Sequence, residues 1–147
     1  MKHLNYQTLQ DLNYDGYLLN EAPERVLQFG EGNFMRAFVD FFIDKMNETA
    51  NFNSKVVLVQ PIPKFTTPDV GDFINEQEGL YTLYLRGSEN GQEVSSKRVI
   101  SCISRCLNAY SDYEAVMECA KNPELRFITC NTTEAGIEYL GTEKLSD

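Results

Sequence analysis

The residues whose types and spacing point most clearly to chemistry lie in one short glycine turn. Residues 26–37 read Val-Leu-Gln-Phe-Gly-Glu-Gly-Asn-Phe-Met-Arg-Ala, an apolar run followed by two glycines and an amphipathic stretch. A strand that ends at Gly30 and turns through Gly32 into a helix presents free backbone N–H groups, which is the geometry that binds phosphate. The spacing also matches the first two positions of the dinucleotide-binding pattern G-x-G-x-x-G. Met35 occupies the third position, so the match is partial.

A second polar segment, residues 131–136, reads Asn-Thr-Thr-Glu-Ala-Gly and follows another short apolar run. Ligands of an open parallel sheet bind beyond the carboxyl ends of its strands, so both segments would border one crevice if their strands share a sheet. The glycine turn would then hold a pyrophosphate. The second segment would line the nicotinamide or sugar end, with Thr132 and Thr133 as hydroxyl partners and Glu134 as a carboxylate. The alternative for this segment is a helix cap alone.

The ribose hydroxyls of NAD are often bound by an acidic residue about 20 residues past the glycine turn. Here the next apolar run ends at Gln60, which offers neutral hydrogen bonds, and Asp69 or Asp72 could reach in from the loop that follows. Lys64 leaves a 2′-phosphate possible. The expected cofactor is therefore NAD, with NADP left open.

The predicted site binds a cofactor and includes no metal ligand. Arg36 belongs to the first helical turn, near the expected phosphate, and Glu31 is expected to point toward the nicotinamide or the substrate. The alternative for the two glycines is a tight turn that serves only helix packing. The predicted cofactor-binding residues are Phe29, Gly30, Glu31, Gly32, Asn33, Phe34, Arg36, Gln60, Thr132, Thr133 and Glu134.

Composition narrows the class of protein. The chain has 147 residues, of which 42% are hydrophobic, and this predicts one globular domain. Its net charge of −9 argues against sequence-independent nucleic-acid binding, which needs clustered cations. No apolar run is long enough to span a membrane and the first residues lack an apolar signal core, so a cytoplasmic protein is expected. The four cysteines form no C-x-x-C pair and are interpreted as buried, reduced thiols.

The elements that must position these residues alternate in type. The pattern predicts a long helix over residues 33–48 with Asp40 and Asp44 on its outer side, and an irregular loop over residues 61–78. A further helix is expected to begin at a capping box formed by Ser111 and Glu114. Buried parallel strands are predicted at residues 25–29, 55–60, 101–107 and 126–130, and an antiparallel hairpin at residues 80–86 and 93–100.

Together these elements predict an α/β fold. It is a Rossmann-like, mostly parallel sheet with helices on both faces and an inserted antiparallel β-hairpin. Residues 1–24 are expected to form an extended N-terminal arm. Residues 25–147 are expected to form an incomplete dinucleotide-binding domain, because four parallel strands are predicted where a complete fold has about six.

The segment from Val26 to Asp40 resembles the N-terminal segment of the mannitol dehydrogenase family of long-chain polyol dehydrogenases. The resemblance runs from about residue 24 to residue 141, and it accounts for Met35-Arg36, because this family replaces the third glycine and follows it with arginine. Further stretches agree in the same order: Val56–Ile62, Gly79–Thr82, Arg86–Gly87, Asn122–Phe127 and Asn131–Ile137.

This resemblance implies an NAD-dependent, metal-independent oxidoreductase that reduces a keto-uronate, D-tagaturonate, with NADH to D-altronate. Members of the family place a catalytic lysine, with nearby asparagine and histidine, in a C-terminal helical domain. The chain is therefore expected to be the cofactor-binding portion, to contain no catalytic residue and to be inactive alone. The alternatives are a non-catalytic nucleotide-binding or protein-interaction module of the same fold, and a nucleotide-free α/β domain.

Overall fold

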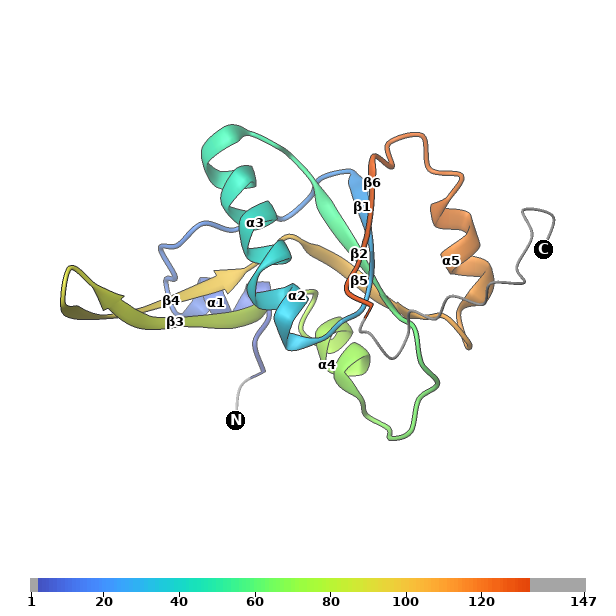
Figure 1. The fold of residues 1–147 in the computed structure, drawn as a ribbon, viewed down its shortest axis with the longest axis horizontal. Coiled ribbons are helices and arrows are strands. Elements are labelled where there is room, and N and C mark those ends of the chain that lie inside the picture. Colours follow the sequence, from blue (N-terminus) through green and yellow to red (C-terminus); the bar gives the residue numbers. More distant parts are fainter. Residues whose placement is uncertain (1–2, 133–147) are drawn as a thin grey trace, which may run out of the picture.

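The computed structural model describes residues 3–132 of the chain. The centre of this part is a parallel sheet in the order β5-β2-β1-β6 (Figure 1). Its strands are β1 (Glu24–Phe29), β2 (Lys55–Gln60), β5 (Ile103–Asn108) and β6 (Phe127–Cys130). Numbered along the chain as parallel strands, they have the order 3-2-1-4 that begins a doubly wound dinucleotide-binding sheet. The predicted fold class and its four parallel strands are confirmed.

The register of the sheet brings three strand ends to one edge. Phe29, the last residue of β1, pairs with Val59 of β2 and with Cys130 of β6. The chain therefore leaves β1 at Gly30, β2 at Pro61 and β6 at Asn131 on the same side of the sheet. The crevice predicted from the sequence lies at this edge of the sheet.

Helices cover both faces of the sheet, as predicted. On one face, Val26 and Leu58 pack with α3 (Val39–Ala50) and α4 (Val70–Glu76) in the larger apolar cluster. On the other, Leu27, Val57 and Val59 pack against α5 (Tyr113–Cys119). Figure 1 shows α3 and α5 on opposite sides of the strands.

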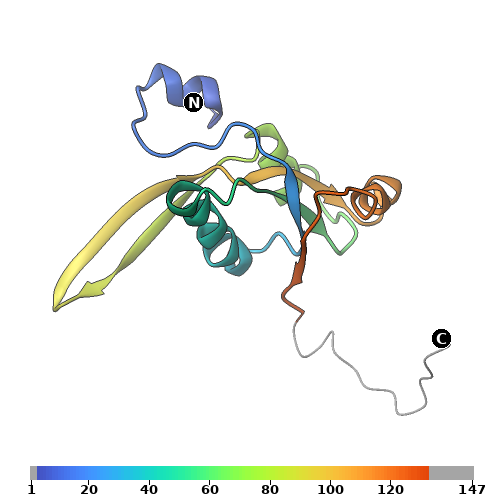
Figure 2. The ribbon, with the colours of Figure 1, turned by 90° about the horizontal axis from the view of Figure 1, so that it is seen from above.

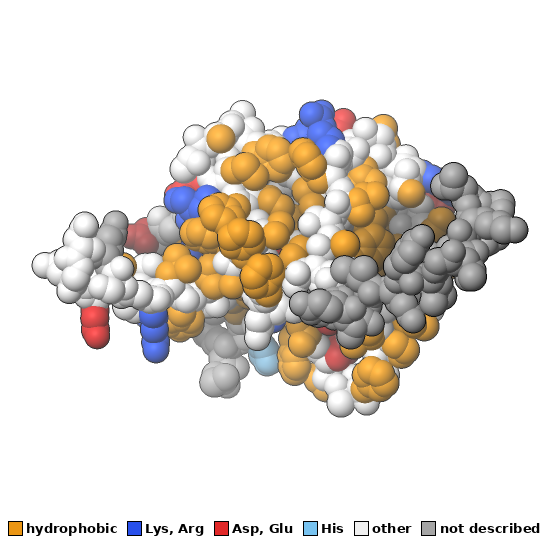
Figure 3. Space-filling model, viewed as in Figure 1, with side chains coloured by type: hydrophobic (Ala, Val, Ile, Leu, Met, Phe, Trp, Pro, Cys, Tyr) orange, Lys and Arg blue, Asp and Glu red, His pale blue; other side chains and the backbone are white. Residues whose placement is uncertain are grey.

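The helix predicted over residues 33–48 is instead two helices, and its buried face was predicted wrongly. A short α2 (Asn33–Ala37) meets α3 at Phe38, where the backbone leaves the regular helical geometry. Asp40 and Asp44, expected on the outer side, have no exposed surface. The exposed face carries apolar side chains instead, namely Phe34, Phe38, Phe42 and Met46 (Figure 3).

The predicted hairpin is present as β3 (Tyr81–Glu89) and β4 (Gln92–Ile100), with Asn90 and Gly91 at positive φ in its turn. It projects away from the sheet (Figure 2). Arg98 of β4 and the Ser101 segment, which directly follows β4, both donate hydrogen bonds to Asp44 of α3. These polar groups allow the acidic face of the helix to be buried. These partners lie far along the chain from α3, so the helix sequence alone could not reveal them.

Three local predictions also need correction. The N-terminal arm is not wholly extended, because it contains α1 (Tyr6–Asp11), whose Leu9 packs on the base of the hairpin. The loop over residues 61–78 contains α4, which Asp69 and Asp72 begin with a capping box. The capping box predicted at Ser111 does not form, since α5 begins after Asp112, whose carboxylate accepts from the backbone of Asn108.

The strand β6 is an exposed edge strand and not the buried strand that was predicted. Phe127 and Ile128 are both largely exposed. Cys102, Cys106 and Cys119 are buried free thiols as expected, whereas Cys130 is free but exposed.. Within residues 3–132, none of the helices has the length and apolar character needed to cross a membrane.

Candidate cofactor-binding site

The glycine turn between β1 and α2 is open toward solvent. Gly30 has a φ of 111°, a conformation that favours glycine, and its N–H donates to the carbonyl of Val59 at 2.8 Å. Gly32 precedes α2 with extended backbone, φ −66° and ψ 165°. A Cβ built on either glycine would meet no atom within 4 Å. The space above the turn is therefore free for a ligand that approaches the backbone.

The carbonyls of this turn are held from the protein side. Gln28 is fully buried beneath the turn and donates from Nε2 to the Gly30 carbonyl at 3.1 Å. Arg36 donates from Nε to the Glu31 carbonyl at 2.8 Å. Because N–H and C=O point in opposite directions across a trans peptide, the Glu31 N–H faces away from Gln28 and the Gly32 N–H away from Arg36.

Neither of these two N–H groups donates to another group within the described residues. Two adjacent free N–H groups above an open turn form a binding position for an anion. The helix contributes little to it, since α2 has only five residues. The sequence predicts a helix end as the site for the anion, whereas the structure offers chiefly the oriented peptides of the turn.

A cavity of about 240 Å³ lies on the turn, at the carboxyl ends of β1, β2 and β6. Doubly wound sheets bind their ligands at this edge, where the direction of strand order reverses. The cavity joins the two segments that the sequence singled out, because Asn131 lines it together with the glycine turn. Its lining residues are Gly30, Glu31, Gly32, Phe34, Met35, Pro61, Ile62 and Asn131.

A second, polar cavity of about 230 Å³ opens beside the ends of β2 and β5. Asn108 connects the two cavities, because its Nδ2 donates to Gln60 Oε1 at 3.1 Å and to the carbonyl of Ile62 at 2.9 Å. Asp69 lies next to Gly71, which lines this cavity, and its Oδ1 accepts from the Asp72 N–H at 2.9 Å. Its other oxygen, Oδ2, is buried and has no partner within the described residues.

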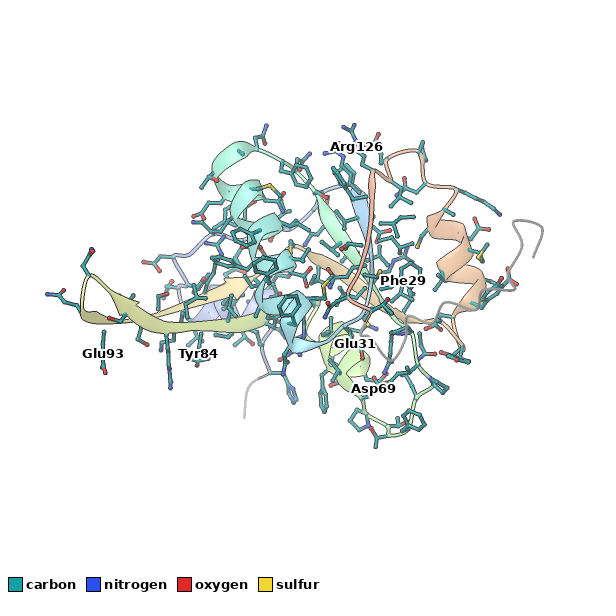
Figure 4. All side chains as sticks on the ribbon, in the orientation of Figure 1. Phe29, Glu31, Asp69, Tyr84, Glu93 and Arg126 are labelled. Carbon is teal, nitrogen blue, oxygen red and sulfur yellow. The ribbon has the colours of Figure 1, made fainter. Side chains whose placement is uncertain are left out.

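Charges at this edge are mostly negative. Burial, together with the nearby carboxylates of Glu31 and Asp69, raises the pKa of the Cys106 thiol to about 12. Figure 4 shows Glu31 between Phe29 and Asp69 at the carboxyl end of the sheet. The two cations that the described residues place here are already engaged: Lys64 is paired with Asp72, and Arg36 binds the Glu31 carbonyl and Asn33. An anionic cofactor must therefore be held here mainly by backbone N–H groups.

The structure brings most of the predicted residues to this edge, but it gives them different surroundings. Gly30, Glu31, Gly32 and Phe34 line the first cavity and Gln60 the second. Asn33 accepts a hydrogen bond from Arg36, whose guanidinium stands over the ring of Tyr81. The side chain of Phe29 packs in the cluster on the α5 face. Thr132 is exposed, and Thr133 and Glu134 lie outside the described residues.

Sequence reasoning missed Asn108 and the apolar wall formed by Pro61 and Ile62. Asn108 ends a strand that was predicted to stop one residue earlier, so its place at the sheet edge was a signal that could have been used. It also missed the buried pair Gln28 and Asp40. The alternation of side chains in β1 gave no hint of a buried glutamine beneath the turn.

The family model described as the mannitol dehydrogenase Rossmann domain matches residues 24–145. The chain belongs to the mannitol dehydrogenase family. Three similar curated proteins are altronate oxidoreductases: that of Phocaeicola vulgatus is 48% identical over 139 residues, that of Bacteroides thetaiotaomicron 46% over 147, and one from Escherichia coli 44% over 140. They cover 95%, 100% and 95% of this chain, which spans 28% of the length of each.

Solved structures agree with this membership in the mannitol dehydrogenase family. Mannitol 2-dehydrogenase of Pseudomonas fluorescens, solved as a ternary complex with NAD and D-mannitol, has a TM-score of 0.73 and is 27% identical. The match covers 92% of this chain and 27% of the mannitol 2-dehydrogenase chain. D-sorbitol dehydrogenase in its substrate-free form shares the fold, with a TM-score of 0.74 at 23% identity. This match covers 90% of this chain and 27% of the D-sorbitol dehydrogenase chain.

Proposed function

We propose that this chain binds NAD(H) at the edge formed by β1, β2 and β6, and that it is the cofactor-binding portion of an oxidoreductase that reduces D-tagaturonate with NADH to D-altronate. The observation that carries the proposal is the open turn, whose Glu31 and Gly32 N–H groups are free and face away from the side chains that hold its carbonyls. In this proposal, these two groups donate to the pyrophosphate. Backbone donors suit a diphosphate in surroundings that are otherwise negative.

The second cavity fits the adenosine ribose. Asn108 binds the amide oxygen of Gln60 there, which leaves the amide nitrogen of Gln60 for a ribose hydroxyl, and the unpartnered Asp69 Oδ2 beside the cavity is a further acceptor for the ribose diol. A carboxylate oxygen accepts from a hydroxyl but repels a phosphate. Lys64, the cation that would favour a 2′-phosphate, is already paired with Asp72. These groups support NAD over NADP.

The proposal of D-tagaturonate as the substrate rests on the relatives, which are named altronate oxidoreductases. Bound NADH supplies the hydride, and the residues of this chain orient the cofactor and shield its diphosphate. We assign no catalytic residue to the chain and place the catalytic groups in the helical domain that the resemblance implies. Residues 1–24 act as an arm and residues 25–147 as the incomplete cofactor domain. The free thiols suit a cytoplasmic protein. Its proposed partner is a small sugar-acid substrate.

The test uses Gly32→Val and NADH fluorescence. Valine fits the extended backbone of Gly32, and a Cβ there meets nothing in the protein, so the fold should be unaffected and only a ligand should be blocked. We expect the variant to bind NADH at least about tenfold more weakly, which corresponds to about 1.4 kcal/mol. Gly87→Val on the hairpin is the matched control, because a Cβ also meets nothing there.

Unchanged NADH affinity in Gly32→Val would remove the turn from the site. If neither the parent chain nor the control binds NADH, the cofactor proposal fails. The interaction-module alternative then gains support from the exposed apolar face of α2 and α3 and from the open edge strand β6.

A further inference from the structure

Beneath the glycine turn lies a buried carboxyl–amide pair that the proposed function does not use. Asp40 in the first turn of α3 and Gln28 in β1 are both fully buried. Gln28 Nε2 donates to Asp40 Oδ2 at 3.4 Å and to the Gly30 carbonyl at 3.1 Å. The amide therefore connects the carboxyl group directly to the backbone of the turn.

Each member of the pair has one oxygen without a partner within the described residues: Asp40 Oδ1 and Gln28 Oε1. Two buried acceptors left unpaired are costly. A single proton on Asp40 satisfies both, because a carboxylic acid and a primary amide can form two parallel hydrogen bonds, O–H to the amide oxygen and N–H to the carboxyl oxygen. An ionised Asp40 has no donor to offer Gln28 Oε1.

We propose that Asp40 is held as a neutral carboxylic acid paired with Gln28, and that this pair is a positioning device for the cofactor turn. The pair fixes the Gln28 amide, the amide holds the Gly30 carbonyl inward, and the trans peptide then points the Glu31 N–H outward. This inference rests on the proposed function, since it concerns how the same turn is prepared for a diphosphate.

The groups around Asp40 agree with a neutral acid. Burial raises its pKa from the ordinary 3.8 to about 7, against the lowering effects of the Gln28 hydrogen bond, Arg36 on α2 and the Tyr81 hydroxyl on β3. Asp44, one turn further along α3, contributes to this raised pKa. Cys102, beyond β4, donates from Sγ to the Asp40 backbone carbonyl, and burial keeps its own thiol protonated by raising its pKa.

Ionisation would act on the turn in two ways. It removes the hydrogen bond to Gln28 Oε1, which frees the amide to rotate away from the Gly30 carbonyl. It also puts a buried negative charge below the position proposed for the pyrophosphate, where water screens it poorly. Cofactor affinity should therefore fall as the pH rises through the range in which Asp40 loses its proton.

The test compares the parent chain with Asp40→Asn by NMR and by NADH titration. Asparagine reproduces the neutral acid, since its Nδ2 donates to Gln28 Oε1 at every pH. His3, the sole histidine of the chain, is replaced by glutamine in both proteins because histidine titrates in the same range. Carbon-detected NMR follows the Asp40 carboxyl, and the amide signals of Gly30 and Glu31 report the turn.

In the parent, we expect the Glu31 amide to shift with the same midpoint as the Asp40 carboxyl, and the NADH Kd to rise about tenfold from about pH 6 to about pH 9. In Asp40→Asn, both should stay flat over this range. A shift of the Glu31 amide without any NADH binding would support the pair and overturn the proposed function. An Asp40 carboxyl already ionised at about pH 5, or the same pH dependence in Asp40→Asn, would overturn the pair.

Gln28→Met provides a second variant that does not depend on the folding of Asp40→Asn. It keeps a side chain of similar length but removes the amide. Titration of Asp40 should then no longer move the Glu31 amide signal. If the two signals still move together, Gln28 does not transmit the change and the positioning role is wrong.

Discussion

At the scale of single residues, the unusual feature is that two carboxyl groups are fully buried next to the sheet. Asp40 and Asp44 are both fully buried, yet they are stabilised in opposite ways. Asp44 accepts two bonds from Arg98, whereas Asp40 faces an amide and has a strongly raised pKa. The cation offsets the cost of burying Asp44, whereas for Asp40 burial favours the protonated form.

The raised pKa of Asp40 predicts a pH-dependent cost to stability. The unfolded chain releases this proton near the ordinary value of 3.8, while the folded chain keeps it until about pH 7. The contribution of Asp40 to the free energy of unfolding is therefore fully present below pH 3.8, and it is lost as the pH rises to about 7. Relative to the parent, Asp40→Asn should gain up to about 4 kcal/mol between about pH 4 and about pH 8, measured by urea unfolding at each pH. A pH-independent difference between the two proteins would contradict this.

At the scale of elements, the helix after the glycine turn shows what the sequence could predict. Its existence and its place after β1 followed from the spacing of apolar residues and from the glycines. Its orientation did not, because Phe38, Phe42 and Met46 gave the stronger apolar pattern and yet are exposed. The buried face is set by Arg98 and the Ser101 segment, which the hairpin brings from far along the chain.

The contact between α3 and the hairpin should therefore be a main source of stability. Asp44→Ala removes the acceptor of Arg98 Nε and Nη2, of the Ser101 N–H and of the Ser101 hydroxyl, and leaves the guanidinium with its bond to Glu48. We expect a loss of about 3 kcal/mol in the free energy of unfolding. Glu48→Ala is the matched control, since Glu48 binds the same Arg98 from the exposed side of α3 and should cost less than about 1 kcal/mol. Equal losses in the two variants would show that burial of Asp44 is not what stabilises the contact.

At the scale of the whole molecule, the four parallel strands and the shared edge of their carboxyl ends were predictable from apolar runs and polar segments. The degree of burial of β6 was not predictable, because an apolar strand has the same sequence pattern at the centre and at the edge of a sheet. Phe127 and Ile128 are both exposed on β6, and Phe127 lines a hollow of about 310 Å³ together with Met46, Phe52 and other side chains of the α3 face. The exposed face of α2 and α3 adjoins this region (Figure 3).

This apolar surface predicts that the chain self-associates at high concentration despite its net charge of −9. An edge strand offers unpaired backbone groups, and an aromatic face beside it gives a second copy something to bury. Replacing Phe38 and Phe42 together with serine should shift sedimentation-velocity profiles toward monomer and leave the fold intact, because both side chains are about half exposed. Tyr84→Ser on the distant hairpin is the control, with an equally exposed aromatic ring that should not matter. A parent chain that stays monomeric up to about millimolar concentration would show that charge repulsion outweighs the apolar surface.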